Sequence, residues 1–184
     1  MKPSDVVSDV FKLFNEKGHR AYGEDVTELQ HALQCATIAR SRGEPPAIVA
    51  ACLLHDYGHL VHDLGEDIAD RGIDARHEAI GANRLDRLFT AEVVEPVRLH
   101  VAAKRYLCWK DPAYLSGLSD ASSQSLMLQG GPMSDAEARE FERHPHYQAA
   151  VRVRHYDDLG KDPTLKTPDI EDFRQELEAF VQVA

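Results

Sequence analysis

The sequence lacks the features that define several common classes of protein. No apolar run reaches the about 18 residues that a membrane span needs. The N-terminal segment Met-Lys-Pro-Ser-Asp has no hydrophobic stretch of the kind found in a signal peptide. The 3 cysteines, Cys35, Cys52 and Cys108, are widely spaced and odd in number, so no disulfide framework is expected. These absences predict a cytoplasmic protein that has no membrane partner.

Positive charge is also scarce. The chain has 21 lysines and arginines against 31 aspartates and glutamates, which gives a net charge of -10. Because a phosphate backbone requires a basic surface, we expect no nucleic-acid partner. A small anionic substrate is still compatible, since a few local cations or a metal ion can attract it. The length of 184 residues and the hydrophobic content of 43% predict a single domain over residues 1–184.

Helix signals dominate the chain, and no convincing alternation of apolar and polar residues indicates a strand. Capping boxes begin helices at Thr27 and Ser134, and glycines mark helix ends at Gly18, at Gly43 (the end of the helix that begins at Thr27) and near Gly160. The acidic segment from 59 to 72 is expected to be a loop or lid. The fold class is therefore all-α. The expected helices cover about 6–17, 28–41, 46–55, 75–88, 91–104, 121–128, 135–142, 145–156 and 169–181.

His55 and Asp56 form the most informative pattern. They follow the run Ala-Ala-Cys-Leu-Leu and precede Tyr-Gly-His, which ends at His59. A solvated surface would not place an imidazole and a carboxylate directly after such an apolar run. A buried metal site would, because a cation offsets the cost of burying charge.

Other candidate metal ligands are spread along the chain and fall on several expected helices. Imidazole and carboxylate ligands suit iron, zinc or manganese, and a set without cysteine argues against a structural zinc site. Asp56 has two carboxylate oxygens and can bridge two metal ions. A lone histidine is more often a surface or core residue, which is our interpretation of the remaining histidines. The further candidates are His31, His77, His100 and Asp157.

Two basic residues share helix faces with candidate ligands. Lys104 lies four residues after His100, and Arg154 lies three residues before Asp157. Either one alone is more often a solvated surface residue. Beside a metal ion, each is placed to bind an oxyanion.

The order His31, His55-Asp56, Asp157 resembles the metal-binding pattern of the HD-domain superfamily. Longer stretches between residues 24 and 168 resemble the HD-domain mixed-valence diiron oxygenases, which cleave carbon–phosphorus bonds. These stretches are Leu29-Gln-His-Ala-Leu-Gln-Cys-Ala36, His100-Val-Ala-Ala-Lys-Arg-Tyr-Leu107, Leu118-Ser-Asp-Ala-Ser122, Gln129-Gly-Gly-Pro-Met133 and Asp157-Asp-Leu-Gly-Lys161.

The resemblance implies a metal centre built from residues 31–157. It assigns one iron to His31, His55, Asp56 and Asp157. It assigns a second iron to Asp56, as a bridge, and to His77 and His100. The two ions would be Fe(II) and Fe(III), and dioxygen would be the co-substrate.

The resemblance also implies residues for substrate binding, catalysis and a lid. The family's lid tyrosine falls on Ala21, one place before Tyr22, and Ser125 stands where the family has threonine. The implied catalytic residues are Asp56, His59 and Lys104. The implied substrate-binding residues are His59, Lys104, Ser122, Ser125 and Arg154. The implied lid residues are Glu24 and Tyr22.

The expected function is oxidative cleavage of a small zwitterionic organophosphonate. The resemblance implies 1-hydroxy-2-aminoethylphosphonate or its N-trimethylated form as substrate, with phosphate and glycine or glycine betaine as products. A primary ammonium prefers carboxylates, whereas a quaternary ammonium prefers aromatic faces. The sequence leaves both open, with candidates Tyr22, Tyr57, Tyr106, Trp109, Glu24, Asp63, Glu66 and Asp67. The alternatives are a metal-dependent HD phosphohydrolase and a non-catalytic HD binding module.

Overall fold

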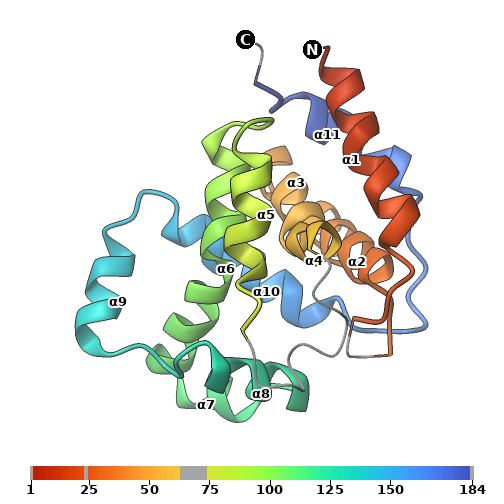
Figure 1. Ribbon diagram of the computed structural model, residues 1–184. Helices are drawn as coiled ribbons and strands as arrows, with labels where there is room; N and C mark the ends of the chain where they lie inside the picture. Colours follow the sequence, from red (N-terminus) through yellow and green to blue (C-terminus); the bar gives the residue numbers. More distant parts are fainter. Residues whose placement is uncertain (1, 23–24, 63–73, 183–184) are drawn as a thin grey trace.

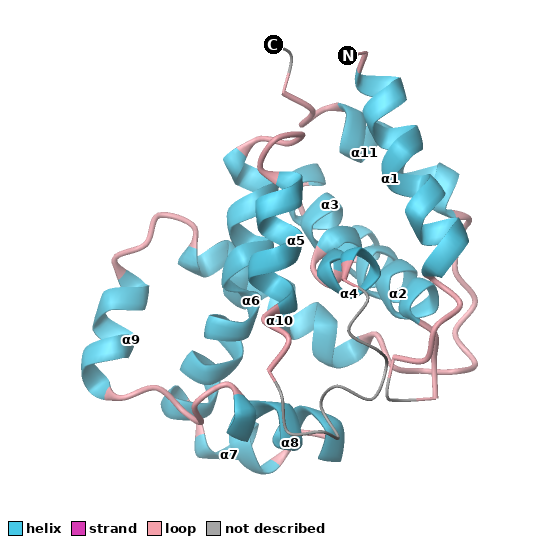
Figure 2. Ribbon diagram, in the orientation of Figure 1, coloured by secondary structure: helices cyan, strands magenta, loops and turns pink. Residues whose placement is uncertain are grey.

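The computed structural model describes residues 2–22, 25–62 and 74–182, and these ranges contain helices and no named strand (Figure 2). The expected all-α class is confirmed. In chain order the helices are α1 (Pro3–Lys17), α2 (Glu28–Ser41), α3 (Pro46–Leu54), α4 (Tyr57–Val61), α5 (His77–Leu85), α6 (Ala91–Lys110), α7 (Pro112–Ser116), α8 (Asp120–Leu128), α9 (Asp135–Glu142), α10 (Tyr147–Leu159), the 3-10 helix η1 (Ile170–Phe173) and α11 (Arg174–Glu178).

The two predicted capping boxes are present. The hydroxyl of Thr27 accepts a hydrogen bond from the Gln30 amide at 3.2 Å, and the Gln30 side chain accepts one from the Thr27 amide at 2.8 Å. Ser134 and Glu137 make the same reciprocal pair. Each box satisfies amide groups that have no partner inside the helix, so α2 and α9 begin where the sequence indicates.

Several predicted boundaries are wrong. The expected loop beginning at His59 is helical up to Val61, because the glycines and most of the acidic residues of that segment come only later. The helix expected from residue 75, with Asp74 as its cap, begins at His77, and the carboxylate of Asp74 accepts a hydrogen bond from the amide of Arg76 instead. Helix α7 was not predicted. Residues 63–72 of the expected loop or lid lie outside the described residues, and so does the expected lid residue Glu24.

Helix α3 lies at the centre of the main hydrophobic core. All of its residues from Ile48 to Leu54 are buried, and it contacts α2, α6, α10 and α11 (Figure 1). Cys35 and Cys52 are fully buried in this core, as predicted. A helix that is apolar on all sides must be covered on all sides. Because α3 ends at Leu54, inside the core, His55 and Asp56 directly after it are buried as well.

A smaller hydrophobic cluster joins the second half of α6 to α9 and α10. Helices α7 and α8 lie near the same end of α6, at the bottom of Figure 1, while both chain termini lie at the opposite end. The buried members of the cluster are Ala103, Tyr106, Leu107, Met133, Ala138, Phe141 and Ala150. Helices α6 and α10 pack against each other and take part in both clusters. This continuity supports one domain over residues 1–184, which stays a prediction.

Helices α4 and α5 approach each other through two glycines. A Cβ atom built on Gly58 would overlap the carbonyl oxygen of His77 and would lie 3.0 Å from the amide nitrogen of Gly81. Only a residue without a side chain allows this backbone contact. The contact places His77, the first residue of α5, next to Asp56.

None of the described helices is both long enough and apolar enough to cross a membrane.

Candidate metal centre

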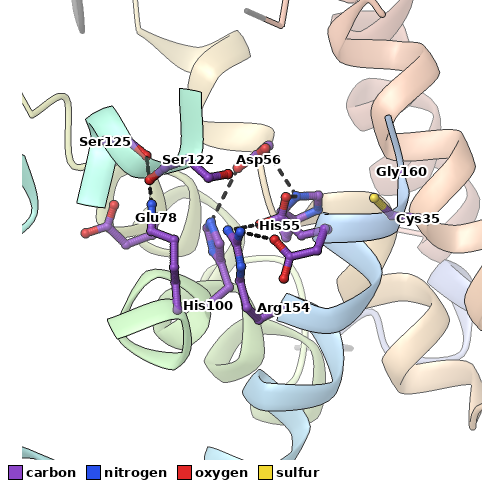
Figure 3. Close-up of polar contacts among 12 residues, drawn as sticks. Cys35, His55, Asp56, Glu78, His100, Ser122, Ser125, Arg154 and Gly160 are labelled. Atoms are coloured by element: carbon purple, nitrogen blue, oxygen red, sulfur yellow. Dashed lines mark hydrogen bonds and ion pairs between the residues drawn. The ribbon is translucent and has the colours of Figure 1, made fainter. Parts of the chain in front are cut away.

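The structure brings all six predicted ligands into one buried site. His31 comes from α2, His55 and Asp56 from the junction of α3 and α4, and the remaining three from α5, α6 and α10. The side chains of His31 and His55 are fully buried, and the most exposed of the six, His77, has 12% of its side chain exposed. Figure 3 shows Asp56 with contacts toward both His55 and His100. The six residues are His31, His55, Asp56, His77, His100 and Asp157.

The first group of ligand atoms surrounds Oδ2 of Asp56. Nε2 of His55 lies 3.2 Å from this oxygen, and Nε2 of His31 lies 3.5 Å from it. The two imidazole nitrogens are 3.0 Å apart. Oδ1 of Asp157 lies 3.5 Å from Nε2 of His31 and 3.9 Å from Nε2 of His55.

The second group surrounds the other oxygen of Asp56. Oδ1 lies 3.1 Å from Nε2 of His77 and 3.4 Å from Nε2 of His100, and these two nitrogens are 3.1 Å apart. Ligand atoms that share a metal ion at about 2.1 Å lie about 3.0–3.4 Å from one another. Each oxygen of Asp56 therefore belongs to a different group with the spacing of a metal site.

The protonation of the histidines also fits metal ions. Nδ1 of His31, His55 and His100 lies 2.7–2.8 Å from the backbone carbonyl of Gly160, Cys52 and Val97, respectively. A carbonyl oxygen only accepts, so each Nδ1 carries a proton, and Nε2 is the ring nitrogen left to bind a metal ion. A metal ion between facing Nε2 atoms about 3 Å apart would take the place of the protons that the neighbouring carboxylates otherwise favour on these rings. The two groups are thus able to hold metal ions.

Gly160 makes the contact to His31 possible. A Cβ atom at this position would overlap the sulfur of Cys35 and would lie 3.1 Å from Nδ1 of His31. The Cys35 sulfur lies 3.8 Å from both ring nitrogens of His31, so it does not lie along the lone pair of Nε2. Cys35 therefore packs beside the ring, as a core residue does.

Electrostatics at the site favour bound cations. Burial opposes ionisation of Asp56, yet His55 and the other imidazoles hold its pKa well below the usual range. Burial also opposes ionisation of Asp157, and Arg154 and His31 outweigh it and lower the pKa. Burial would lower the pKa of His55, but Asp56 and Asp157 raise it to about 9. The two carboxylates thus stay ionised inside the protein and need positive charge beside them.

Lys104 extends from α6 toward helix α8. Only 3% of its surface is exposed, and its ammonium donates a hydrogen bond to the hydroxyl of Ser125 at 2.8 Å. Burial, followed by the charge of Arg154, lowers the pKa of Lys104 to about 8. Ser122 lies one turn before Ser125 and is also buried. In Figure 3 these serines lie across the site from Cys35 and Gly160.

The guanidinium of Arg154 contacts side chains of its own helix, α10, and of α7. Its Nη1 donates to Oδ2 of Asp157 at 2.6 Å, its Nη2 pairs with Asp158, and its Nε donates to the hydroxyl of Tyr114 at 2.9 Å. Tyr114 in turn donates to Asp158 at 2.6 Å. Arg154 therefore holds one oxygen of Asp157 and leaves the other facing the histidines.

Two aromatic rings lie against the ligand histidines. The ring of Tyr22 stacks on His31 with centroids 3.8 Å apart, and its hydroxyl donates to Oδ1 of Asp157 at 3.3 Å. His59 stacks on His77 with centroids 4.1 Å apart. Burial, followed by His77, lowers the pKa of His59 well below its usual value, so this ring is neutral. Of the predicted lid pair, Glu24 lies outside the described residues.

The other residues suggested for the ammonium end serve different purposes or are not described. Tyr57 packs on Phe14, and Tyr106 packs on Phe141. Trp109 donates to Asp135. Asp63, Glu66 and Asp67 lie outside the described residues.

Sequence reasoning missed four residues beside the site. Glu28 is buried, and burial together with Asp56 raises its pKa to about 8. Its position three residues before His31, on the same helix face, was the signal that could have found it. Lys161 donates to Ser122, and Tyr114 and Asp158 hold Arg154. The contacts of Lys161 and Tyr114 depend on tertiary packing and leave no periodic pattern. Asp158 lies four residues after Arg154 on α10, and that spacing was the signal that could have found it.

Comparisons with known proteins agree with this site. The HD-domain family model matches residues 29–134, more than half of the chain. A hydroxymethylphosphonate dioxygenase of Gimesia maris is 41% identical over 98% of this chain and 90% of its own length. The glycine-betaine-forming 1-hydroxy-2-(trimethylamino)ethylphosphonate dioxygenase of Leisingera caerulea is 41% identical over 96% of this chain and 91% of its own length. An uncharacterized protein of Acanthamoeba polyphaga mimivirus is 35% identical over 84% of this chain and 72% of its own length.

The chain belongs to the HD-domain family. Within that family, its near full-length similarity places it with the phosphonate dioxygenases. The predicted resemblance to HD-domain oxygenases that act on phosphonates is thereby confirmed.

The contact between α4 and α5 yields a testable prediction. In Gly58→Ala, the added methyl group overlaps the backbone of His77 and must push α5 away. We expect the variant to lose about 1–3 kcal/mol of stability and to lose metal mainly at the group formed by His77 and His100. Thermal unfolding and metal analysis measure the two effects. Gly117→Ala is the control. Its Cβ would lie 3.3 Å from the carbonyl oxygen of Ala113, which is close but not an overlap, and Gly117 ends α7, a helix that supplies none of the six ligands. Unchanged metal content in Gly58→Ala would contradict the prediction.

Proposed function

We propose that this protein is a diiron dioxygenase that cleaves the carbon–phosphorus bond of a small hydroxyalkylphosphonate. The observation that carries the proposal is the position of Asp56. Its two oxygens each face a separate group of histidine nitrogens, 3.1–3.5 Å away, and Lys104 is buried in the same region. The two dioxygenase relatives support the phosphonate as substrate class.

The proposed ligand sets follow the two groups. One iron would be held by His31, His55, Asp56 and Asp157, and the other by Asp56, His77 and His100. A mixed-valence Fe(II)/Fe(III) pair at this site would supply the redox chemistry that lets dioxygen serve as co-substrate. Nitrogen and oxygen ligands without sulfur suit these ions.

The chain's own residues bind and orient the phosphonate group. Lys104 supplies a buried ammonium for charge-assisted hydrogen bonds, and Ser122 and Ser125 supply hydroxyls on the same side. His59 supplies a neutral imidazole next to His77. The contacts of Arg154 support a role in holding Asp157, and its direct contact with substrate stays a prediction.

Tyr22 is the proposed cover of the site. Its ring lies on His31 and its hydroxyl bonds to Asp157, so it limits the access of water to the first ligand group. Its partnership with Glu24 as a lid stays a prediction. Excluding water strengthens the electrostatic contacts within the site.

A zwitterionic substrate is favoured by Glu28. Burial keeps this carboxyl group largely protonated near neutral pH, because its pKa is raised to about 8. A substrate ammonium placed beside it would favour the ionised form. A primary ammonium would also donate a charge-assisted hydrogen bond, whereas a trimethylated ammonium, which has no N–H, would gain charge attraction alone. We therefore propose 1-hydroxy-2-aminoethylphosphonate or its N-trimethylated form, converted to phosphate and glycine or glycine betaine.

The test is an oxygen-dependent release of phosphate. Iron-loaded protein should release phosphate from hydroxyalkylphosphonates only when dioxygen is present, and label from dioxygen should enter the new carboxylate. Phosphate released from simple phosphate esters without oxygen would favour a hydrolase. Tight binding of the phosphonates without turnover would favour a binding module.

Lys104→Ala tests the phosphonate contact. We expect kcat/KM to fall about ten- to hundredfold, because one charge-assisted contact is worth roughly 1.5–3 kcal/mol. Iron content should not change, since Lys104 is not a ligand. Lys104→Arg should recover only part of the activity, because its donors are placed differently. A Lys104→Ala variant with the kcat/KM of the unmodified protein would refute the assignment.

Glu28→Gln tests the ammonium contact. The change keeps size and hydrogen bonding but removes the ionisable group. We expect KM for the aminated substrates to rise about tenfold, as for a lost charge-assisted contact. Hydroxymethylphosphonate, which has no ammonium, should show an unchanged KM. Equal effects on both kinds of substrate would assign Glu28 a structural role.

A further inference from the structure

Two lysine side chains contact the region of helix α8: Lys104, which comes from α6, and Lys161, which follows α10. The ammonium of Lys161 donates to the hydroxyl of Ser122 at 3.1 Å and to that of Ser119 at 3.3 Å. Lys161 directly follows Gly160, whose carbonyl accepts the hydrogen bond from Nδ1 of His31. The segment that carries Lys161 is therefore tied to the first ligand group.

The two lysines meet at the same part of α8. Ser122 and Ser125 are one helical turn apart, and each accepts a hydrogen bond from a different ammonium. The Ser125 hydroxyl donates to the backbone carbonyl of Ser122, so the two positions are directly linked. Two ammonium groups that donate to hydroxyls one helical turn apart are placed to bind one dianion together.

Local charge balance separates Lys104 from Arg154. The guanidinium of Arg154 is neutralised by Asp157 and Asp158 on its own helix. Among the described residues, Lys104 donates to a hydroxyl and forms no ion pair with a carboxylate. A phosphonate carries up to two negative charges, and Arg154 already has two carboxylate partners.

We propose that Lys161 is a substrate-binding residue that supplies the second positive charge for the phosphonate group, opposite Lys104. Ser119 and Ser122 position its ammonium, and the phosphonate dianion binds between the two lysines at α8. The inference rests on the proposed function, because it takes a phosphonate to be the substrate. Lys161 is not among the substrate-binding residues expected from the sequence. The proposal predicts that the positive charges of both lysines set the affinity for the dianion.

Binding of methylphosphonate to the iron-loaded protein tests the proposal. Methylphosphonate has no hydroxyl on the carbon to be oxidised, so calorimetry measures affinity without turnover. We expect Lys161→Met, which keeps the apolar stem, to weaken binding about tenfold, the loss of one charge-assisted contact. Lys161→Arg keeps the charge and should bind within about threefold of the unmodified protein. Iron content and melting temperature should not change in either variant.

Lys166→Met is the matched control, because Lys166 is exposed and lies in the same segment after α10. It should bind methylphosphonate as the unmodified protein does. If Lys161→Met binds with unchanged affinity, or loses affinity only together with iron, Lys161 merely anchors its segment to α8 and the proposal is wrong. If the unmodified protein releases phosphate as proposed, that failure leaves the proposed function standing. If the unmodified protein fails to bind any phosphonate, the proposed function fails as well.

Discussion

Asp56→Ala is expected to remove both metal ions and to abolish turnover. Asp56 is the one residue placed in both ligand groups, with Oδ2 facing His31 and His55 and Oδ1 facing His77 and His100. Changing a residue that merely supports a metal ligand already costs about 10- to 100-fold in metal affinity or activity. Loss of the shared ligand should therefore cost more than about a hundredfold in activity. Elemental analysis and oxygen consumption measure the two effects.

The control for Asp56 is His77→Ala, which removes a ligand from the second group alone. We expect this variant to keep about one metal ion per chain and to lose activity. The unmodified protein should contain two. If Asp56→Ala retained a full metal ion per chain, or if the unmodified protein bound only one, the bridging assignment would be wrong.

The ligand set could be predicted from sequence because its residues carry local signals. His55 and Asp56 end an apolar helix, and that position can be recognised without knowing the fold. Their neighbours in space come from α2, α5, α6 and α10, so only the resemblance to a known pattern grouped them before the structure did. Apolar periodicity predicts which face of a helix is buried, but not which residues of other helices meet there.

The contacts around Arg154 show where sequence reasoning ends. Its spacing to Asp157 predicted a shared helix face, and the structure places the two side chains 2.6 Å apart. Tyr114 reaches the same guanidinium from α7, a helix that was not predicted because five residues give too short a periodic signal. Lys161 was assigned no role for a related reason: its partners on α8 are about forty residues away along the chain. Such pairs are set by tertiary packing alone.

Arg154→Ala is expected to be the most destabilising change near the site. Arg154 is buried, and its loss removes the cation that pairs with both Asp157 and Asp158 in the interior. Breaking a buried ion pair by removing one partner costs about 3–5 kcal/mol. Asp157 would also be free to rotate away from His31, so metal occupancy of the first group should fall. Denaturant unfolding and metal analysis measure these effects.

Arg152→Ala is the matched control on the same helix. Arg152 pairs with Glu44, but 47% of its side chain is exposed, so its loss should cost less than about 1 kcal/mol. The two arginines thus separate a buried ion pair from an exposed one. If Arg154→Ala kept its stability and its metal but lost affinity for methylphosphonate, the guanidinium would act on the substrate and not on Asp157. Because Asp157 holds the first ligand group to α10, we expect stability and metal content to fall together.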